Sequence, residues 1–133
     1  MPYLNVKLSA PPSQQTTAAI AAQLTELTTA VLHKKRELTS VAVEYVPSGQ
    51  CFIGGESLAA QGLATFYLDI KVTEGTNSKD EKAAYVSQVF AAVETLLGKL
   101  HPTSYIVIHE VRGDAWGYQG RTQEFRYIQG KAL

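Results

Sequence analysis

The chain contains an internal repeat, and a repeat restricts the choice of fold more than any other feature of a sequence of this length. Tyr3–Leu8 (YLNVKL) returns as Tyr67–Val72 (YLDIKV). The remaining matches keep the same offset to within one residue: Thr39–Ser40 with Thr103–Ser104, and Gly54–Gly55 with Gln119–Gly120. The sequence therefore predicts a single domain over residues 1–133 in which one structural unit occurs twice, as pseudo-repeats of about 1–60 and 61–133.

Each copy has the pattern of a strand, a helix and a second strand. Alternating apolar residues at Leu4, Val6 and Leu8 predict a half-buried strand, and residues 66–72 keep the same alternation. Helical spacing of apolar residues follows in each half: Ile20, Leu24, Leu27 and Val31, then Val86, Val89, Val93, Leu96 and Leu100. Second strands are expected at about residues 41–46 and 105–111.

A strand, a crossover helix and a second strand form a βαβ unit with parallel strands. Two such units side by side predict an α+β (α/β) fold, a four-stranded sheet with both helices on one face. The other face then displays Tyr3, Lys7, Tyr67 and Lys71. This mixture of aromatic and charged side chains favours self-association, for which a closed ring is a common solution.

Charge and cysteine content exclude several classes of protein. Twelve Lys and Arg balance twelve Asp and Glu, so no basic field is present to attract nucleic acid or a membrane surface. The single cysteine, Cys51, excludes an internal disulfide framework, and the three histidines lack the spacing of metal ligands. Without a nucleotide-binding motif either, we expect no metal and no cofactor. Neither a membrane-spanning run nor a signal peptide is recognisable, so a cytoplasmic location is expected.

The sequence resembles the tautomerase superfamily. The resemblance rests on Met1-Pro2 directly before the first strand, the doubled βαβ unit, "LTSVAVEYV", "FIGGES" and the C-terminal "DAWGYQGRTQEFRY". Small members, such as 4-oxalocrotonate tautomerase, are single βαβ units. Longer members, among them malonate semialdehyde decarboxylase and macrophage migration inhibitory factor, fuse two units and form trimers. This chain is similar to these longer members. The resemblance implies a tautomerase/MIF-like fold and a homotrimer.

The resemblance also implies a catalytic role for Pro2 as an N-terminal amine. Removal of Met1 would leave a secondary amine, and burial lowers the pKa of such a group toward neutrality. An amine of this kind moves a proton between two atoms of one substrate, which is general acid–base catalysis of enol–keto conversion. The implied function is an isomerase acting on a 2-oxo or 2-hydroxy-dienoic acid, or an aryl pyruvate. Phe66 occupies the equivalent position of the second unit and has no such amine.

The residues that bind the substrate are less directly indicated. Trp116, Tyr118 and Phe125 match the aromatic pocket residues of the fused decarboxylase in spacing, with packing between subunits as the alternative role. Other members of the family hold the substrate carboxylate with arginines. The corresponding positions of this chain are at about Pro12 and Ala42, and for a second pair at about Gly75 and Asn77, so all of these arginines are replaced. The candidates to replace these cations are Lys34, Lys35, Arg36, Arg112 and Arg121. His109 is a further candidate for contact with the small carboxylic acid, or a hydrogen-bonded structural residue.

Three alternative functions remain open from the sequence. The same proline activates water for hydration or dehalogenation of an acrylate if a carboxylate positions that water, and Glu110 is the nearest candidate. Decarboxylation of a three-carbon acid is the second alternative. The third is a non-catalytic oligomer that keeps the fold and binds a partner or a small acid, which the replaced arginines favour.

Overall fold

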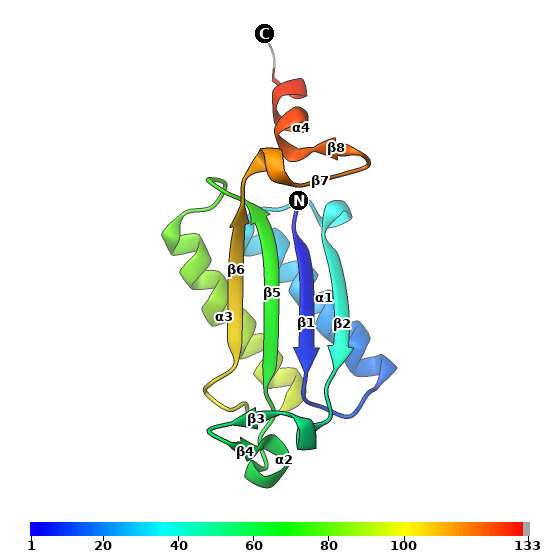
Figure 1. Ribbon diagram of the computed structural model, residues 1–133, viewed down its shortest axis with the longest axis vertical. Helices are drawn as coiled ribbons and strands as arrows, with labels where there is room; N and C mark the ends of the chain where they lie inside the picture. The colour runs from blue at the N-terminus through cyan, green and yellow to red at the C-terminus, as the bar shows by residue number, and fades with distance from the viewer. Residues whose placement is uncertain (132–133) are drawn as a thin grey trace.

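The computed structural model describes residues 1–131, and apart from one short helix, η1, its elements recur in the same order in both halves of the chain (Figure 1). The first half contains β1 (Tyr3–Leu8), α1 (Gln14–Leu32), η1 (Arg36–Leu38), β2 (Ser40–Tyr45), η2 (Ser48–Gln50), β3 (Phe52–Ile53), β4 (Glu56–Ser57) and α2 (Leu58–Gln61). The second half contains β5 (Phe66–Thr73), α3 (Lys79–Leu97), β6 (Tyr105–Val111), η3 (Gly113–Ala115), β7 (Gly117–Tyr118), β8 (Arg121–Thr122) and α4 (Gln123–Gln129).

The four long strands form one mixed sheet in the order β2-β1-β5-β6. β1 pairs in parallel with β2, β5 pairs in parallel with β6, and the two units join through antiparallel β1 and β5. Figure 1 shows α1 and α3 together on one face of this sheet. The predicted fold class, tandem βαβ units in a four-stranded sheet with two helices on one face, is therefore confirmed.

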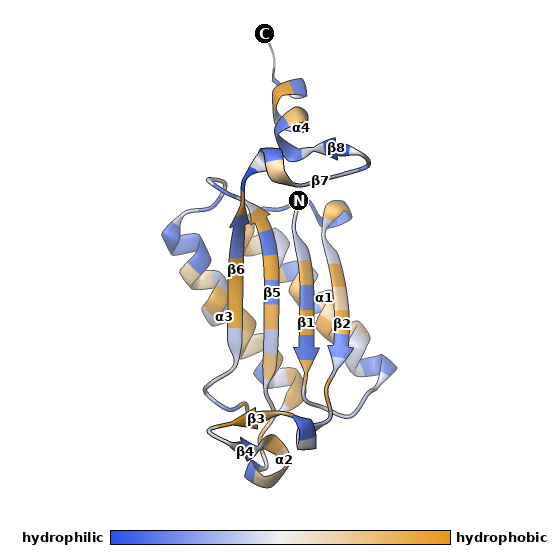
Figure 2. Ribbon diagram, viewed as in Figure 1, coloured by the Kyte–Doolittle hydropathy of each residue, from blue (hydrophilic) through white to orange (hydrophobic). Residues whose placement is uncertain are grey.

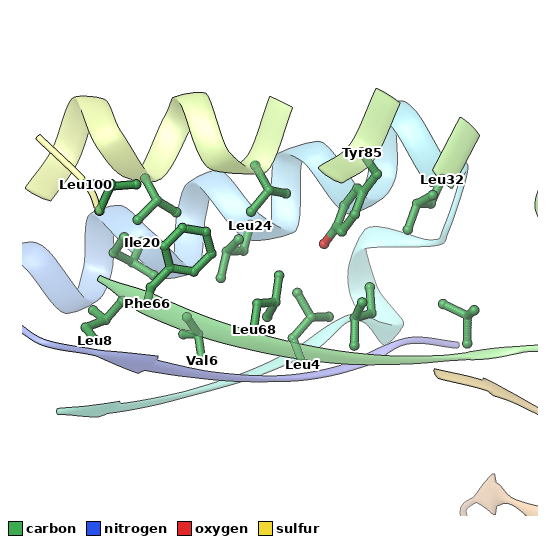
Figure 3. Close-up of a cluster of buried hydrophobic side chains, with 14 residues drawn as sticks. Leu4, Val6, Leu8, Ile20, Leu24, Leu32, Phe66, Leu68, Tyr85 and Leu100 are labelled. Atoms are coloured by element: carbon green, nitrogen blue, oxygen red, sulfur yellow. The ribbon is translucent and has the colours of Figure 1, made fainter. Parts of the chain in front are cut away.

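The hydrophobic core lies between the sheet and the two long helices (Figure 3). The alternation along β1 and β5, visible as alternating colours in Figure 2, directs one set of side chains into this core. Leu4, Val6, Leu68 and Ile70 are fully buried, as the period of two predicts. Their neighbours Tyr3 and Tyr67 lie on the open face of the sheet and are exposed.

The predicted stripes are confirmed at Ile20, Leu24, Val89, Val93 and Leu100, which are buried, and they depart from the buried faces at the remaining positions. Thr28 and Leu32 are fully buried on α1, although the stripe was predicted through Leu27 and Val31, which pack at its edge. On α3, Tyr85 is fully buried and Val86 is exposed. The reason is that each helix packs against the other as well as against the sheet, and a hydrogen bond of 2.9 Å joins the Thr28 hydroxyl to the Tyr85 hydroxyl. Leu96, also predicted in the stripe, is exposed as well.

Each unit ends in a small hairpin followed by a short helix, and the two ends lie far apart. β3, β4 and α2 lie at one end of the sheet, whereas β7, β8 and α4 lie at the other, beside the N-terminus (Figure 1). Both hairpin turns use left-handed backbone, at Gly54 and Gly55 in the first and at Gln119 and Gly120 in the second. The antiparallel join of the units therefore brings the C-terminal segment to the start of β1.

Candidate functional site

The start of β1 lies at the end of the sheet where β5 and β6 finish. Tyr3 is paired with Lys71 in the antiparallel register, so the two residues before Tyr3 lie beside the end of β5. The chain leaving β6 continues into η3, β7, β8 and α4 at this same end. Three segments distant in the sequence thus meet around Pro2.

A cavity of about 760 Å³ opens between these segments. Its volume lies in the range of small-molecule binding sites. Its lining is polar and aromatic, and comes from the chain start, the end of α1, the end of β5 and the C-terminal segment: Met1, Lys35, Thr73, Glu74, Gly75, Thr76, Gly113, Tyr118, Gln123, Glu124, Arg126, Tyr127, Gln129 and Gly130. The second half of the sequence supplies twelve of these fourteen residues, so the site is built mainly by the unit that lacks the proline.

Pro2 is buried directly behind Met1, which lines the cavity. The Ser40 backbone N–H donates to the Pro2 carbonyl at 3.2 Å, and this bond fixes the start of β1 against β2. Burial, together with the charges of Lys34 and Lys35, lowers the pKa of the Met1 amine to about 6. An amine at this place is therefore largely neutral near pH 7 and accepts a proton.

The two lysines differ in their own contacts. The Lys34 ammonium donates to the Thr76 hydroxyl at 2.8 Å, and burial lowers the pKa of Lys34 in spite of the attraction of Glu81. Lys35 lines the cavity. Both follow His33, which caps α1 in the left-handed conformation and turns the chain toward the sheet end.

The aromatic side of the cavity is formed by Tyr118, which Arg126 covers. The Arg126 guanidinium lies 3.7 Å from the centroid of the Tyr118 ring. Its Nη2 donates to the Tyr118 carbonyl at 3.0 Å and to the Gln119 side-chain oxygen at 3.3 Å. Gly117 permits this fold of the hairpin, because a Cβ there would lie 1.9 Å from the Arg121 carbonyl oxygen. The contacts hold β7, the turn and α4 together.

Trp116 supports the cavity from behind Thr73. The half-buried indole donates from Nε1 to the Thr73 hydroxyl at 3.2 Å, and Thr73 itself lines the cavity. Of the residues predicted from the sequence, the structure thus brings together Pro2, Lys35, Trp116 and Tyr118. They lie at one end of the sheet.

The other predicted residues lie outside the cavity lining. Arg36 is paired with Glu26 on α1, and Arg112 is paired with Asp114, at 3.0 Å between Nη2 and Oδ2. This pairing raises the pKa of Arg112 and lowers that of Asp114.

Three further candidate residues also make their contacts outside the cavity. Arg121 lies over the exposed ring of Phe125, 4.7 Å from its centroid. His109 bonds to Asp69 at 2.6 Å on the open face of the sheet, the structural arrangement that the sequence left as the alternative. Glu110, considered for positioning water, pairs with Lys82 of α3 at 3.1 Å. None of these residues lines the cavity.

The sequence analysis missed Arg126, together with the acidic residues Glu74 and Glu124 of the lining. A signal for Arg126 was present in the sequence. Thr122 caps α4 through the Phe125 N–H, and Gln123, Arg126, Tyr127 and Gly130 follow at the spacing of one helix face. That face lines the cavity, whereas Phe125 lies outside the lining.

Residues 1–131 contain neither a cluster of potential metal ligands nor a membrane-spanning helix. No three His, Cys, Asp or Glu side chains in that part of the chain come together in an arrangement for a metal ion. Likewise, none of its helices combines the length and the apolar character needed to span a bilayer.

These features define a tandem βαβ protein with a cavity at the start of its first strand. A family model described as "Tautomerase enzyme" matches residues 2–61 and again residues 67–126, which together are most of the chain. The chain therefore belongs to the tautomerase family. A comparison with curated protein sequences found no match.

Solved structures share the fold over nearly the whole chain. The Q0 fused 4-OT wild type symmetric trimer has a TM-score of 0.81 at 16% identity, over 97% of this chain and 99% of that one. The macrophage migration inhibitory factor-like protein of Entamoeba histolytica has a TM-score of 0.76 at 21% identity, over 91% and 97%. Pt0534 inactivated by 2-oxo-3-pentynoate has a TM-score of 0.81 at 10% identity, over 97% and 99%. At these identities the likeness concerns the fold.

Proposed function

We propose that the protein is an isomerase that converts the enol of a small 2-oxo acid to its keto form, with the Pro2 amine as general acid and base. The observation that carries this proposal is the place of the chain start: β1 begins at a cavity, where burial and two lysines depress the pKa of the Met1 amine to about 6. Membership of the tautomerase family supports it.

The reaction needs one group that takes and returns a proton. The neutral amine of Pro2 accepts the proton of the enol hydroxyl, and the resulting ammonium delivers a proton to carbon, so the substrate is isomerised without any change in its composition. Lys34 and Lys35 serve by keeping the amine neutral. Tyr118 and Tyr127 supply aromatic surface for the dienoic or aryl part of the substrate.

A second candidate function is supported by the carboxylates of the lining. Hydration or dehalogenation of an acrylate needs a carboxylate that positions water, and Glu74 and Glu124 lie in the cavity, whereas Glu110 does not. Neither glutamate lies in the position at Glu110 from which the sequence predicted that water would be held, and the family match is to tautomerases. Isomerisation is therefore the function that we place first.

We also propose that the protein is a homotrimer. The open face of the sheet displays Tyr3, Tyr67 and Tyr105, with exposed fractions of 45%, 39% and 58% in the single chain. Tyr67 and Tyr105 contact each other, with ring centroids 6.3 Å apart. An aromatic face of this extent is typical of a surface between subunits, and the Q0 fused 4-OT neighbour is a trimer.

Sedimentation equilibrium is expected to give a mass three times that of the 14.5 kDa chain. Tyr105→Glu places a charge on the open face, so we expect it to yield monomers. Val86→Glu is the matched control, because Val86 is 40% exposed on the helical face. A monomeric wild type, or a trimer that withstands Tyr105→Glu but not Val86→Glu, would contradict this assembly.

The proposed chemistry predicts a specific pH dependence. For protein whose mass shows loss of Met1, kcat/KM for ketonisation of phenylenolpyruvate and 2-hydroxymuconate is expected to rise with pH as the Pro2 amine loses its proton. The midpoint of this rise should lie below pH 8, the pKa of an ordinary terminal amine being about 8, because burial and two lysines disfavour the ammonium form. Lys34→Ala and Lys35→Ala each remove a positive charge, so each should move the rise to higher pH.

Lys99→Ala is the control for this experiment, since Lys99 follows α3 at the opposite end of the sheet. The profile of that variant should coincide with the wild type. If the midpoint of the rise in kcat/KM is unchanged in both lysine variants, or moves to lower pH, these charges do not act on the catalytic group. Turnover of a halogenated acrylate without ketonisation would instead favour the second candidate function.

A further inference from the structure

We propose that Arg126 is the residue that binds the carboxylate of the substrate in this cavity, an inference that rests on the proposed function for the identity of the substrate. The carboxylate of a 2-oxo acid is charged at neutral pH, so a cavity that holds it needs a cation. The arginines that the family resemblance led us to expect are replaced at Pro12, Ala42, Gly75 and Asn77.

The charge of Arg126 is not matched by any carboxylate of residues 1–131. The ion pairs of that part of the chain engage other cations, among them Arg36 with Glu26, Arg112 with Asp114 and Lys82 with Glu110. Arg126 donates only to neutral oxygens, the Tyr118 carbonyl and the Gln119 side chain. Its charge is therefore available to an anion in the cavity.

The donors of the guanidinium are incompletely used. Nη2 makes both recorded hydrogen bonds, while the buried Nε has no acceptor among the described residues. Native structures rarely leave a buried donor without a partner. A carboxylate beside the guanidinium would accept from Nη1, or from Nε after a small adjustment of the side chain, and arginine favours such charge-assisted contacts with carboxylates.

Arg126 is also held in place before any ligand arrives. Stacking on Tyr118 at 3.7 Å and two hydrogen bonds restrict its rotamers, so little further side-chain freedom is lost on binding. The two lysines are less suited to this role. Lys34 is engaged with Thr76, and Lys35 is a flexible point charge that acts on the N-terminal amine.

The acidic residues of the lining form no ion pair with Arg126. Glu74 and Glu124 line the cavity, and both also interact electrostatically with Arg112. Arg126 lies on the helix face that includes Gln123 and Tyr127, with the Tyr118 ring beneath it. The arrangement places a cation next to an aromatic surface, which suits an acid with an unsaturated or aryl chain.

The test compares the binding of 3-phenylpropanoate with that of its neutral amide, 3-phenylpropanamide, by calorimetry. Arg126→Met should weaken the acid about 10- to 100-fold, the range for a charge-assisted hydrogen bond, and leave the amide within about twofold. Arg126→Lys should restore part of the preference for the acid. Lys131→Met is the matched control, because Lys131 lies over Tyr127 outside the cavity lining and should keep the wild-type preference.

A measurement on the wild type covers the case in which Arg126→Met fails to fold. The NMR resonance of the Arg126 Nε–H group should shift during titration with the acid and stay unchanged with the amide. No shift at saturation, or an acid preference that is lost in Lys35→Ala and kept in Arg126→Met, would overturn the proposal.

The experiment separates this inference from the proposed function. Pro2→Ala protein should bind the acid as well as the wild type, since binding does not need the proton transfer. If the protein binds the acid through Arg126 but does not catalyse ketonisation, the carboxylate site is supported and the isomerase function is rejected. If the wild type catalyses ketonisation but its preference for the acid is unchanged in Arg126→Met, the isomerase is supported and the carboxylate site at Arg126 is rejected.

Discussion

Pro2→Ala is expected to lower kcat for ketonisation by about 10²- to 10⁴-fold, the contribution of a positioned general acid–base group. Alanine is also small enough for Met1 to be removed, so both proteins should begin at the same position. The variant keeps an amine but loses the ring that fixes φ and holds the nitrogen at the start of β1. Residual activity is therefore expected.

Pro12→Ala is the matched control for this substitution. Pro12 is exposed and lies beyond the far end of β1, away from the cavity that contains Met1. The kcat of the Pro12→Ala variant should equal that of the wild type. If both variants lose activity equally, the effect is on the fold; if neither loses activity, Pro2 is not the acid–base group.

Tyr85→Ala is expected to have the largest effect on stability, lowering the free energy of unfolding by about 3–5 kcal/mol. Tyr85 is fully buried between the helices and the sheet (Figure 3). Its hydroxyl bonds to Thr28, which donates in turn to the Leu24 carbonyl at 2.7 Å. Tyr85→Phe keeps the packing and leaves Thr28 bonded to Leu24, so we expect a loss of only about 1 kcal/mol.

Denaturant unfolding at one fixed subunit concentration measures these differences, because association adds to stability by mass action. Val86→Ala is the control on the same helix, where an exposed side chain should change stability by less than about 0.5 kcal/mol. Equal midpoints for Tyr85→Ala and Val86→Ala would show that the phenol ring does not support the core.

Tyr85 also makes stability depend on pH in the alkaline range. Burial raises its pKa to about 12, above the value of 10 for an exposed phenol. The unfolded chain therefore releases the phenol proton at lower pH than the folded one. The contribution of this group is fully present below pH 10 and is lost as the pH rises to about 12. The wild type should lose stability over that interval more steeply than Tyr85→Phe.

The sequence by itself determined the two βαβ units, because alternation and helical spacing are local patterns that reflect which side of each element is buried. It also marked Pro2, since only a chain start supplies a free prolyl amine. Lys35, Trp116 and Tyr118 followed from the resemblance and lie at or behind the cavity.

Only the tertiary structure decided how the two units meet. The antiparallel pairing of β1 with β5 places the start of one unit beside the end of the other, and local patterns do not specify pairing between distant strands. That pairing brought α4 and Arg126 to the chain start and left Arg121 and Phe125 outside the cavity. The sheet also decided the contact of His109, because the parallel pairing of β5 and β6 brings Asp69 within hydrogen-bonding distance of it across 40 residues of sequence.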